Sequence, residues 1–110
     1  MRTAKALFTA LVIFTCAAIP AAQGRKPATH TITIDAASFQ PATLTIKAGD
    51  TVVWVNKDMM PHTATASGTK PFDSGVLAAG KSWKRVFKTK GELPYVCIFH
   101  PTMKGKLIIR

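Results

Sequence analysis

Three residues near the C-terminus combine a thiol, an imidazole and a thioether within one short segment. Cys97, His100 and Met103 follow one another at C-x2-H-x2-M spacing, and His62, much earlier in the chain, supplies a second imidazole directly behind Pro61. Two histidines and one cysteine with a weak axial methionine form the ligand set of blue-copper electron-transfer sites, in which soft sulfur selects copper. The residue types and their spacing therefore predict one copper ion, cycling between Cu(I) and Cu(II), at His62, Cys97, His100 and Met103.

Each of these residues has a simpler explanation when it is taken alone. A single cysteine such as Cys97 is often a buried core thiol, His62 fits an ordinary loop histidine, and Met103 fits a packing residue. The prediction rests on their joint pattern. Structural zinc is disfavoured because it takes four strong ligands, and a thioether is not among its usual ones. Met59 and Met60 are rivals of Met103 as the axial ligand, but we expect them to line the rim of the site.

Alternating apolar and polar residues predict the strands that must hold this site. We expect strands at 31–35, 42–47, 51–56, 62–66, 82–87, 93–97 and 106–109, with turns at 39–41 and 48–50. No segment shows sustained helical periodicity. Seven or eight short strands at regular spacing are typical of an all-β protein, here an antiparallel sandwich or barrel.

Prolines stiffen both segments that carry the candidate ligands. Pro101 fixes φ directly after His100, and Pro61 restricts the residue before it to extended geometry. We expect His62 to face the ligand loop if the 51–56 strand lies beside the final hairpin. A site held by two stiff loops keeps nearly the same geometry in both oxidation states, which favours fast electron transfer. Gly105 is expected to let the chain reverse into its last strand.

The first residues have the pattern of an export signal. Arg2 and Lys5 precede an apolar run over residues 6–18, which small residues follow. This run is too short to span a membrane but suits a secretory signal peptide. We therefore assign residues 1–24 to a signal peptide and expect a periplasmic location.

Cleavage of this leader after Gly24 leaves one mature domain over residues 25–110, and cleavage after Ala21 is the rival possibility. An uncleaved N-terminal anchor and lipid attachment at Cys16 remain open as alternatives. Removal of the leader also removes Cys16, so Cys97 is left as the one thiol and no intramolecular disulfide can form. An exported thiol needs protection from oxidation, which metal ligation provides.

The charge of the chain excludes some classes of function. Without Arg2 and Lys5, 13 of the 15 Lys and Arg remain against 5 Asp and Glu, a formal net charge of +8. The basic residues are scattered and form no nucleic-acid motif, so we expect a basic surface that steers toward acidic partners. The one thiol has no separate base and orienting group beside it, and no Gly-rich phosphate loop is present. We therefore do not expect an enzyme.

These segments resemble the cupredoxin family of small blue copper proteins, from about His30 to Arg110. Residues 39–41, 44–46 and 49–56 resemble the N-terminal half of the family, and Met60-Pro61-His62 and residues 97–103 match its copper-ligand motifs. The short ligand loop is most similar to that of amicyanins, since plastocyanins have longer loops. The resemblance implies a Greek-key β-sandwich of seven to eight strands that holds one copper ion.

The resemblance also implies a function. The protein would be a periplasmic, monomeric one-electron carrier between redox partners such as a dehydrogenase, a cytochrome or a reductase, with an acidic docking face on the partner. His100 would be the solvent-facing ligand, ringed by apolar residues such as Met60, Pro61 and Pro101. The alternative is a periplasmic copper chaperone or copper-storage protein, which nearby methionines favour because thioethers hold Cu(I).

Two departures from the family pattern concern the surroundings of the sulfur. Thr63 stands where the family usually has Asn directly after its first histidine ligand, and Ile98 and Phe99 stand between Cys97 and His100, where the family often has small residues and proline. We expect hydrogen bonding near the thiolate to be altered or absent as a result. Such contacts tune the reduction potential.

Overall fold

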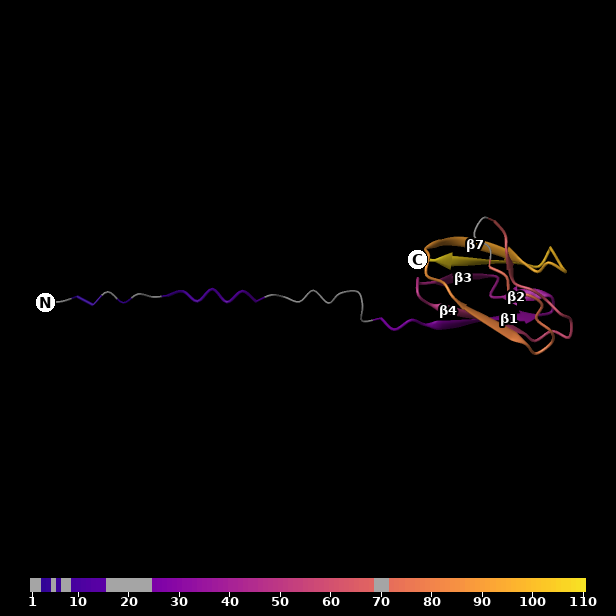
Figure 1. The fold of residues 1–110 in the computed structure, drawn as a ribbon, viewed down its shortest axis with the longest axis horizontal. Helices are drawn as coiled ribbons and strands as arrows, with labels where there is room; N and C mark the ends of the chain where they lie inside the picture. Colours follow the sequence, from indigo (N-terminus) through magenta and orange to yellow (C-terminus); the bar gives the residue numbers. More distant parts are fainter. Residues whose placement is uncertain (1–2, 5, 7–8, 16–24, 69–71) are drawn as a thin grey trace.

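The computed structural model describes residues 3–4, 6, 9–15, 25–68 and 72–110 (Figure 1). The two candidate cleavage positions, Ala21 and Gly24, lie outside the described residues, as does Cys16. Among the described residues, no helix has the length and apolar character that crossing a membrane requires.

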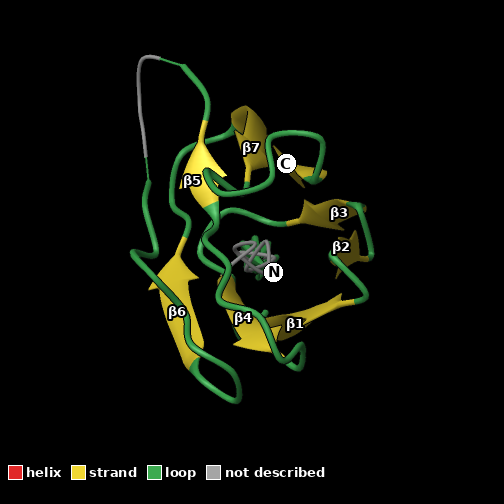
Figure 2. Cartoon of the chain, turned by 90° about the vertical axis from the view of Figure 1, so that its right-hand side faces the viewer, coloured by secondary structure: helices red, strands yellow, loops and turns green. Residues whose placement is uncertain are grey.

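Eight strands form two four-stranded sheets in the described part of the chain. They are β1 (Thr29–Asp35), β2 (Ser38–Gln40), β3 (Thr43–Ile46), β4 (Thr51–Asn56), β5 (Thr65–Ala66), β6 (Ser82–Val86), β7 (Gly91–Val96) and β8 (Lys104–Ile109). The strand orders are β2-β1-β4-β6 and β3-β8-β7-β5. Figure 2 looks down the strands and shows them arranged around one interior. The predicted all-β Greek-key sandwich of seven to eight strands is confirmed.

The expectation of a purely antiparallel sandwich is wrong. β1 pairs with β4 in parallel, and β3 pairs with β8 in parallel. Alternation along a strand reports which face is buried but not the direction of its neighbour, so the pattern could not show this. β4 also lies in the opposite sheet from the β7–β8 hairpin rather than beside it.

Smaller differences concern strand ends. The predicted strand over 62–66 shortens to β5, with His62 in an isolated bridge to Leu77. The predicted turn at 39–41 instead contains the end of β2. Both segments are short and lie next to proline, where alternation over two or three residues is a weak signal.

Inward-facing residues of the two sheets meet around one tryptophan. Trp54 is fully buried, and its ring centroid lies 5.6 Å from that of Tyr95 in the other sheet. Phe72 lies 5.4 Å from Trp54 and 5.8 Å from Tyr95. Aromatic pairs at these distances add to the free energy gained by burying their area. This cluster fixes the two sheets to each other and so fixes the loops at their ends.

A buried carboxylate ties the N-terminal segment to the end of the sandwich opposite the candidate metal site. Asp50 Oδ1 accepts hydrogen bonds from Arg25 at 2.8 Å and from Ala28 N at 2.9 Å, and Oδ2 lies 2.9 Å from His30 Nε2. Oδ2 also accepts a hydrogen bond from Lys47 N at 3.1 Å. Asp50 therefore holds Arg25 and Ala28 in place, and the His30 side chain is only 27 % exposed.

We expect Asp50→Asn to weaken the fold most above pH 4. The hydrogen bond from His30 and those from the backbone amides outweigh the effect of burial and hold the pKa of Asp50 well below its usual range. A carboxyl whose pKa is lower in the folded state stabilises the fold above its unfolded pKa, and this contribution is lost as the pH falls. Urea unfolding between pH 2 and pH 7 should therefore show a lower midpoint and a flatter acid limb in the variant. Glu92→Gln, which removes an exposed pairing with Lys106, should change little.

Candidate metal centre

Two loops at one end of the sandwich bring the predicted metal-binding side chains together. One loop follows β4 and carries His62, and the other joins β7 to β8 and carries Cys97 and His100. Cys97 Sγ lies 3.7 Å from His62 Nδ1 and 3.9 Å from His100 Nδ1. The sulfur and one nitrogen of each ring all lie within 4.8 Å of one another. The structure thus places three of the four predicted site residues in one cluster.

Backbone hydrogen bonds close the loop that carries Cys97, His100 and Met103. Cys97 N donates to Met103 O at 3.1 Å, His100 N donates to Cys97 O at 3.2 Å, and Met103 N donates to His100 O at 2.8 Å. The β7–β8 hairpin ends directly below, with Val96 opposite Lys104. The C-x2-H-x2-M segment is therefore one compact turn. Met103, the fourth predicted residue, is 4 % exposed and packs in the hydrophobic core beneath it.

The surroundings of Cys97 favour its thiolate. Burial by itself opposes ionisation, but the hydrogen bond from the Thr63 N–H and the contact with the His100 ring lead the effects that outweigh it and lower the pKa of the Cys97 thiol to about 6. The side chain is fully buried. At neutral pH the sulfur is therefore anionic, which is the form that binds a soft metal ion.

Thr63 connects the two loops through both its backbone and its side chain. Its N–H donates to Cys97 Sγ at 3.4 Å, and its hydroxyl accepts a hydrogen bond from Ile98 N at 3.0 Å. The expectation that the bond near the thiolate is altered or absent is thus wrong for the Thr63 amide, which reaches the sulfur. A backbone donor does not depend on the side chain at that position, which is why this contact exists with threonine in place of asparagine.

Two residues that the sequence analysis did not single out support His62. Asp58 Oδ2 lies 2.8 Å from His62 Nε2, which leaves Nδ1 on the side of Cys97. Asn56 is fully buried, and its side-chain nitrogen donates to Met60 O at 2.8 Å and to Leu77 O at 2.9 Å. From the sequence, an acidic residue four positions before a candidate ligand in a loop is a weak signal. Only the folded loop shows that Asp58 contacts His62.

His100 lies at the surface edge of the cluster, in contrast to buried His62. Four large apolar side chains of the two loops that carry the candidate ligands are exposed: Met59 by 93 %, Met60 by 58 %, Ile98 by 53 % and Phe99 by 48 %. That Met59 and Met60 line the rim of the site stays a prediction. His100 is thus the one member of the three-residue cluster that is not fully buried.

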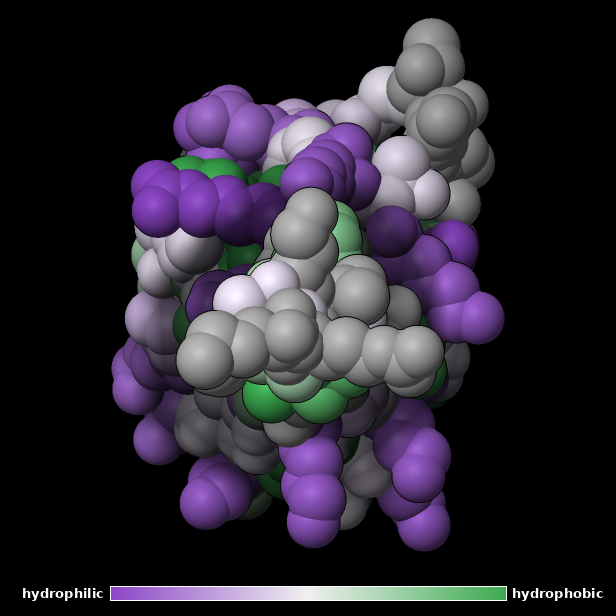
Figure 3. Space-filling model, turned by 90° about the vertical axis from the view of Figure 1, so that its left-hand side faces the viewer, coloured by the Kyte–Doolittle hydropathy of each residue, from purple (hydrophilic) through white to green (hydrophobic). Residues whose placement is uncertain are grey.

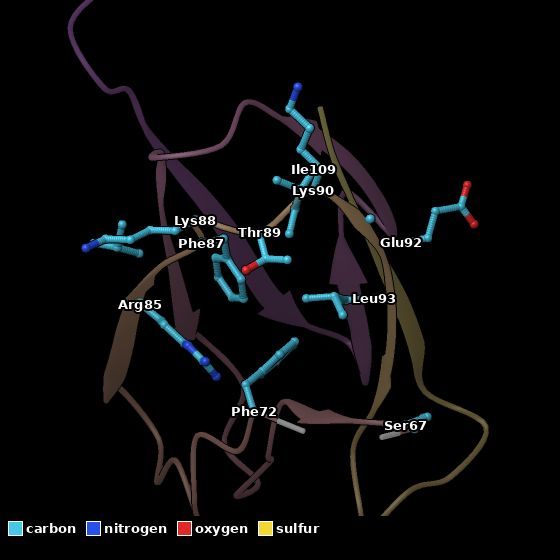
Figure 4. Close-up of a pocket in the computed structure, with 13 residues that line it drawn as sticks. Ser67, Phe72, Arg85, Phe87, Lys88, Thr89, Lys90, Glu92, Leu93 and Ile109 are labelled. Atoms are coloured by element: carbon cyan, nitrogen blue, oxygen red, sulfur yellow. The ribbon is translucent and has the colours of Figure 1, made fainter. Parts of the chain in front are cut away.

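A cavity of about 420 Å³ lies at the other end of the molecule (Figure 4). Phe72, Phe87 and Leu93 form its apolar wall, while Arg85 and Lys88 stand on one side. The cavity adjoins the start of β7, whereas Cys97 follows the end of that strand. None of the clustered histidines or the cysteine lines it, so the chemistry of the cluster is separate from it.

The donor set itself fits copper. Two imidazole nitrogens and one thiolate converge on one point, a combination that suits copper in both common oxidation states. Structural zinc takes four strong protein ligands, and among the described residues only these three His, Cys, Asp or Glu side chains converge here. The fold and this donor set together define a small β-sandwich metalloprotein of the blue-copper type.

This chain belongs to the cupredoxin family, since the profile of the Cupredoxin-like domain matches residues 6–109. It is similar to amicyanin-alpha of Methylorubrum extorquens, with 29 % identity over 96 % of this chain and 92 % of that protein. It is also similar to amicyanin of Paracoccus versutus, with 32 % identity over 82 % of this chain and 72 % of that protein. The predicted resemblance to cupredoxins is thereby confirmed.

Solved structures agree with this assignment. A reduced amicyanin variant superimposes with a TM-score of 0.70 at 27 % identity, covering 74 % of this chain and 82 % of the other. A copper-containing nitrite reductase from Thermus scotoductus SA-01 has a TM-score of 0.71 at 31 % identity. That match covers 78 % of this chain but only 23 % of the reductase, so it concerns one part of a much longer protein.

Proposed function

We propose that this protein is an exported, monomeric electron carrier, not an enzyme, that holds one copper ion. His62, Cys97 and His100 would be its strong ligands and Met103 its weak axial ligand. The observation that carries the proposal is the convergence of Cys97 Sγ with the Nδ1 atoms of both histidines. Bound copper would supply a one-electron couple between Cu(I) and Cu(II).

The protein's own residues support electron carriage in three ways. Backbone hydrogen bonds within the loop from Cys97 to Met103 limit movement between oxidation states. Burial of Cys97 and His62 keeps water from the sulfur. The half-buried ring of His100 and the apolar side chains around it offer a dry contact through which a partner would exchange electrons.

The proposal is tested first by spectroscopy. We expect one copper per chain and an intense visible absorption when the protein is loaded and oxidised, because a thiolate transfers charge to copper. Metal content by mass spectrometry and an absorption spectrum measure both. A colourless oxidised protein with bound copper would contradict thiolate ligation and with it the proposed carrier function.

Export is a further part of the proposal, and it rests on the pattern of residues 1–24. We expect the mature protein to begin at Arg25, or at Ala22 if the rival position is cut. Intact mass of the protein from the periplasmic fraction distinguishes these two outcomes. Recovery of the full chain in the cell membrane would instead support the uncleaved anchor.

A second candidate function is copper delivery or storage in the periplasm. The observation that favours it is the pair of exposed thioethers, Met59 and Met60, near His100. Against it, a buried thiolate with two imidazoles binds copper too tightly for easy release. Mixing the loaded protein with a metal-free acceptor and, separately, with a redox partner separates the two functions. Metal transfer supports delivery, whereas reduction without metal loss supports the carrier.

We expect basic residues near the metal site to speed association with an acidic partner. Lys57 follows β4 and Lys104 begins β8, and both are exposed at this end. Lys106 lies further along β8 and pairs with Glu92 at 3.1 Å, so its charge is partly offset. In stopped-flow electron transfer at low salt, Lys57→Glu with Lys104→Glu should slow association roughly tenfold or more, and salt near 0.1 M should shrink this difference.

The matched control changes the net charge by the same amount, but at the other end of the sandwich. Lys88 and Lys90 line the distant cavity (Figure 4), on the end of the sandwich where hydrophilic side chains stand around the rim (Figure 3). Lys88→Glu with Lys90→Glu should change the rate much less. Equal slowing by the two double variants would show that net charge, and not a docking edge, governs the encounter.

A further inference from the structure

One carboxylate joins the buried histidine of the site to the turn between β1 and β2. Asp58 Oδ2 lies 2.8 Å from His62 Nε2 and accepts a hydrogen bond from Ala37 N at 2.8 Å. Asp58 Oδ1 accepts a hydrogen bond from Ala36 N at 3.1 Å. The histidine is 1 % exposed and the aspartate side chain 19 % exposed, so this contact is largely shielded from water.

The turn that holds Asp58 has an unusual backbone. Ala36 and Ala37 have φ angles of 48° and 52°, a left-handed conformation that alanine rarely adopts. Successive amides in such a turn form a concave site for an anion, and here the carboxylate of Asp58 occupies it. The turn follows β1, and Lys57 N donates to Ile34 O at 2.8 Å beside it. The carboxylate is thus tied to the sheet that contains β1.

The other side of the same loop is held independently. Asp58 N donates to Asn56 Oδ1 at 2.9 Å, while the side-chain nitrogen of Asn56 binds the carbonyl oxygens of Met60 and Leu77. Because backbone amides and a buried side chain fix Asp58, its position does not depend on His62. The histidine ring is therefore oriented by an acceptor that is already in place.

The contact also selects one of the two neutral forms of His62. With the proton on Nε2, the ring donates to Asp58 at 2.8 Å and presents an unprotonated Nδ1 toward Cys97. With the proton on Nδ1, the ring would face the sulfur at 3.7 Å and meet the carboxylate without a proton between them. The shorter contact to a carboxylate favours the first form, and that form leaves Nδ1 ready to bind a metal ion.

We propose that Asp58 is a positioning residue that holds His62 as the Nε2–H tautomer and adds negative charge behind it, which favours Cu(II) over Cu(I). The copper part of this inference rests on the proposed function, whereas the tautomer part does not. A carboxylate behind a metal-binding histidine fixes the ring and raises its basicity. A more basic ligand and a nearby negative charge both stabilise the oxidised ion, which has the higher charge.

The first test uses the metal-free protein. We expect nitrogen NMR of the parent, at a pH where the imidazole is neutral, to show His62 protonated at Nε2. Asp58→Ala should move the proton to Nδ1, toward the thiolate. The matched control is Asp35→Ala, because Asp35 Oδ1 accepts a hydrogen bond from the same Ala36 N at 2.9 Å but does not reach the histidine. A His62 tautomer unchanged by Asp58→Ala would overturn the inference.

The second test measures copper affinity in the two oxidation states. Loss of such a carboxylate lowers metal affinity by about 10–100-fold, and we expect Asp58→Ala to lower Cu(II) affinity by this factor and Cu(I) affinity by less. Asp58→Asn keeps an accepting oxygen but removes the charge, so it should keep the tautomer and still weaken Cu(II) selectively. Asp58→Asn also replaces Asp58→Ala as the test variant if Asp58→Ala does not fold. Equal losses for Cu(II) and Cu(I) would refute the charge effect.

These results separate the inference from the proposed function. A parent protein that binds copper without visible absorption would refute the proposed carrier, and the NMR measurement on metal-free protein would still decide the role of Asp58. A blue protein whose His62 tautomer and Cu(II) affinity respond equally to Asp58→Ala and Asp35→Ala would keep the carrier and refute the positioning role.

Discussion

Replacement of Cys97 by serine is expected to abolish the intense visible absorption of the oxidised, copper-loaded protein. The sulfur is the one soft anionic donor of the cluster, and its surroundings lower the pKa of the thiol to about 6. A serine hydroxyl stays protonated at neutral pH and offers only a weak, hard oxygen donor to a soft ion. Absorption spectra of parent and variant at equal copper loading measure the effect, which should be a complete loss of the band.

Met103→Leu is the matched control for this prediction. Met103 lies in the same loop and is equally buried, but a thioether at the axial position binds weakly. We expect the variant to stay blue and to change its reduction potential, because the axial ligand tunes the couple. A visible band that survives in Cys97→Ser would show that another group donates the charge.

Replacement of Gly105 by alanine is expected to destabilise the sandwich strongly, because it is the one glycine among the described residues whose added Cβ would meet other atoms. Gly105 lies in β8 directly opposite Tyr95 in β7. A Cβ at this position would overlap Cζ and the hydroxyl oxygen of Tyr95 and lie 2.6 Å from its Cε2. The tyrosine cannot move aside easily, since its ring packs at 4.7 Å from Phe39 and at 5.6 Å from Trp54.

The expected cost is about 3 kcal/mol, the upper end of the usual range for overpacking a core. For a domain of this size, that corresponds to a fall of roughly 12–24 °C in the midpoint of thermal unfolding. Circular dichroism during heating measures it. Lys104→Ala, on the exposed face of the same strand, is the control for alanine in β8 and should shift the midpoint little.

A double-variant comparison identifies the cause. In a Tyr95→Leu background, the ring that the methyl group would overlap is absent, so Gly105→Ala should cost much less than in the parent. Equal costs in the two backgrounds would mean that backbone preference, and not contact with Tyr95, makes glycine necessary. Gly105 does not have a positive φ, which already argues against the turn role expected from the sequence.

Local patterns in the sequence determined the elements and much of the candidate site. Alternation over residues 31–35 predicted a strand, and Ile32 and Ile34 are buried on one face of β1, because side chains on a strand point to opposite faces in turn. Cys97, His100 and Met103 lie within one loop, so their mutual placement follows from short spacing and a closing hairpin. The expectation for His62 depended on the 51–56 strand lying beside the final hairpin. That strand, β4, lies in the other sheet, yet the loop after it still brings His62 to Cys97 and His100.

The tertiary structure alone decided which strands pair and in what direction. The parallel pairs β1–β4 and β3–β8 join segments that are far apart in the chain. Period-2 alternation is the same for parallel and antiparallel neighbours, so no local pattern could report them. For the same reason no local pattern indicates that Asp50 binds Arg25 and His30, which lie 25 and 20 residues before it in the chain.

The roles of Asp58 and Gly105 also emerged only from the folded chain. From the sequence, Asp58 is an ordinary acidic loop residue. Its role depends on backbone amides of the turn after β1 and on the orientation of His62 in its own loop, which only the folded chain specifies. From the sequence, Gly105 was expected to serve a turn. In the structure, glycine is needed there because the ring of Tyr95 in the neighbouring strand occupies the space of a side chain. The sequence alone determines which faces are buried and which donors lie close along the chain, because both depend on local geometry. Contacts between distant segments depend on how the whole sandwich packs, and only the tertiary structure specifies them.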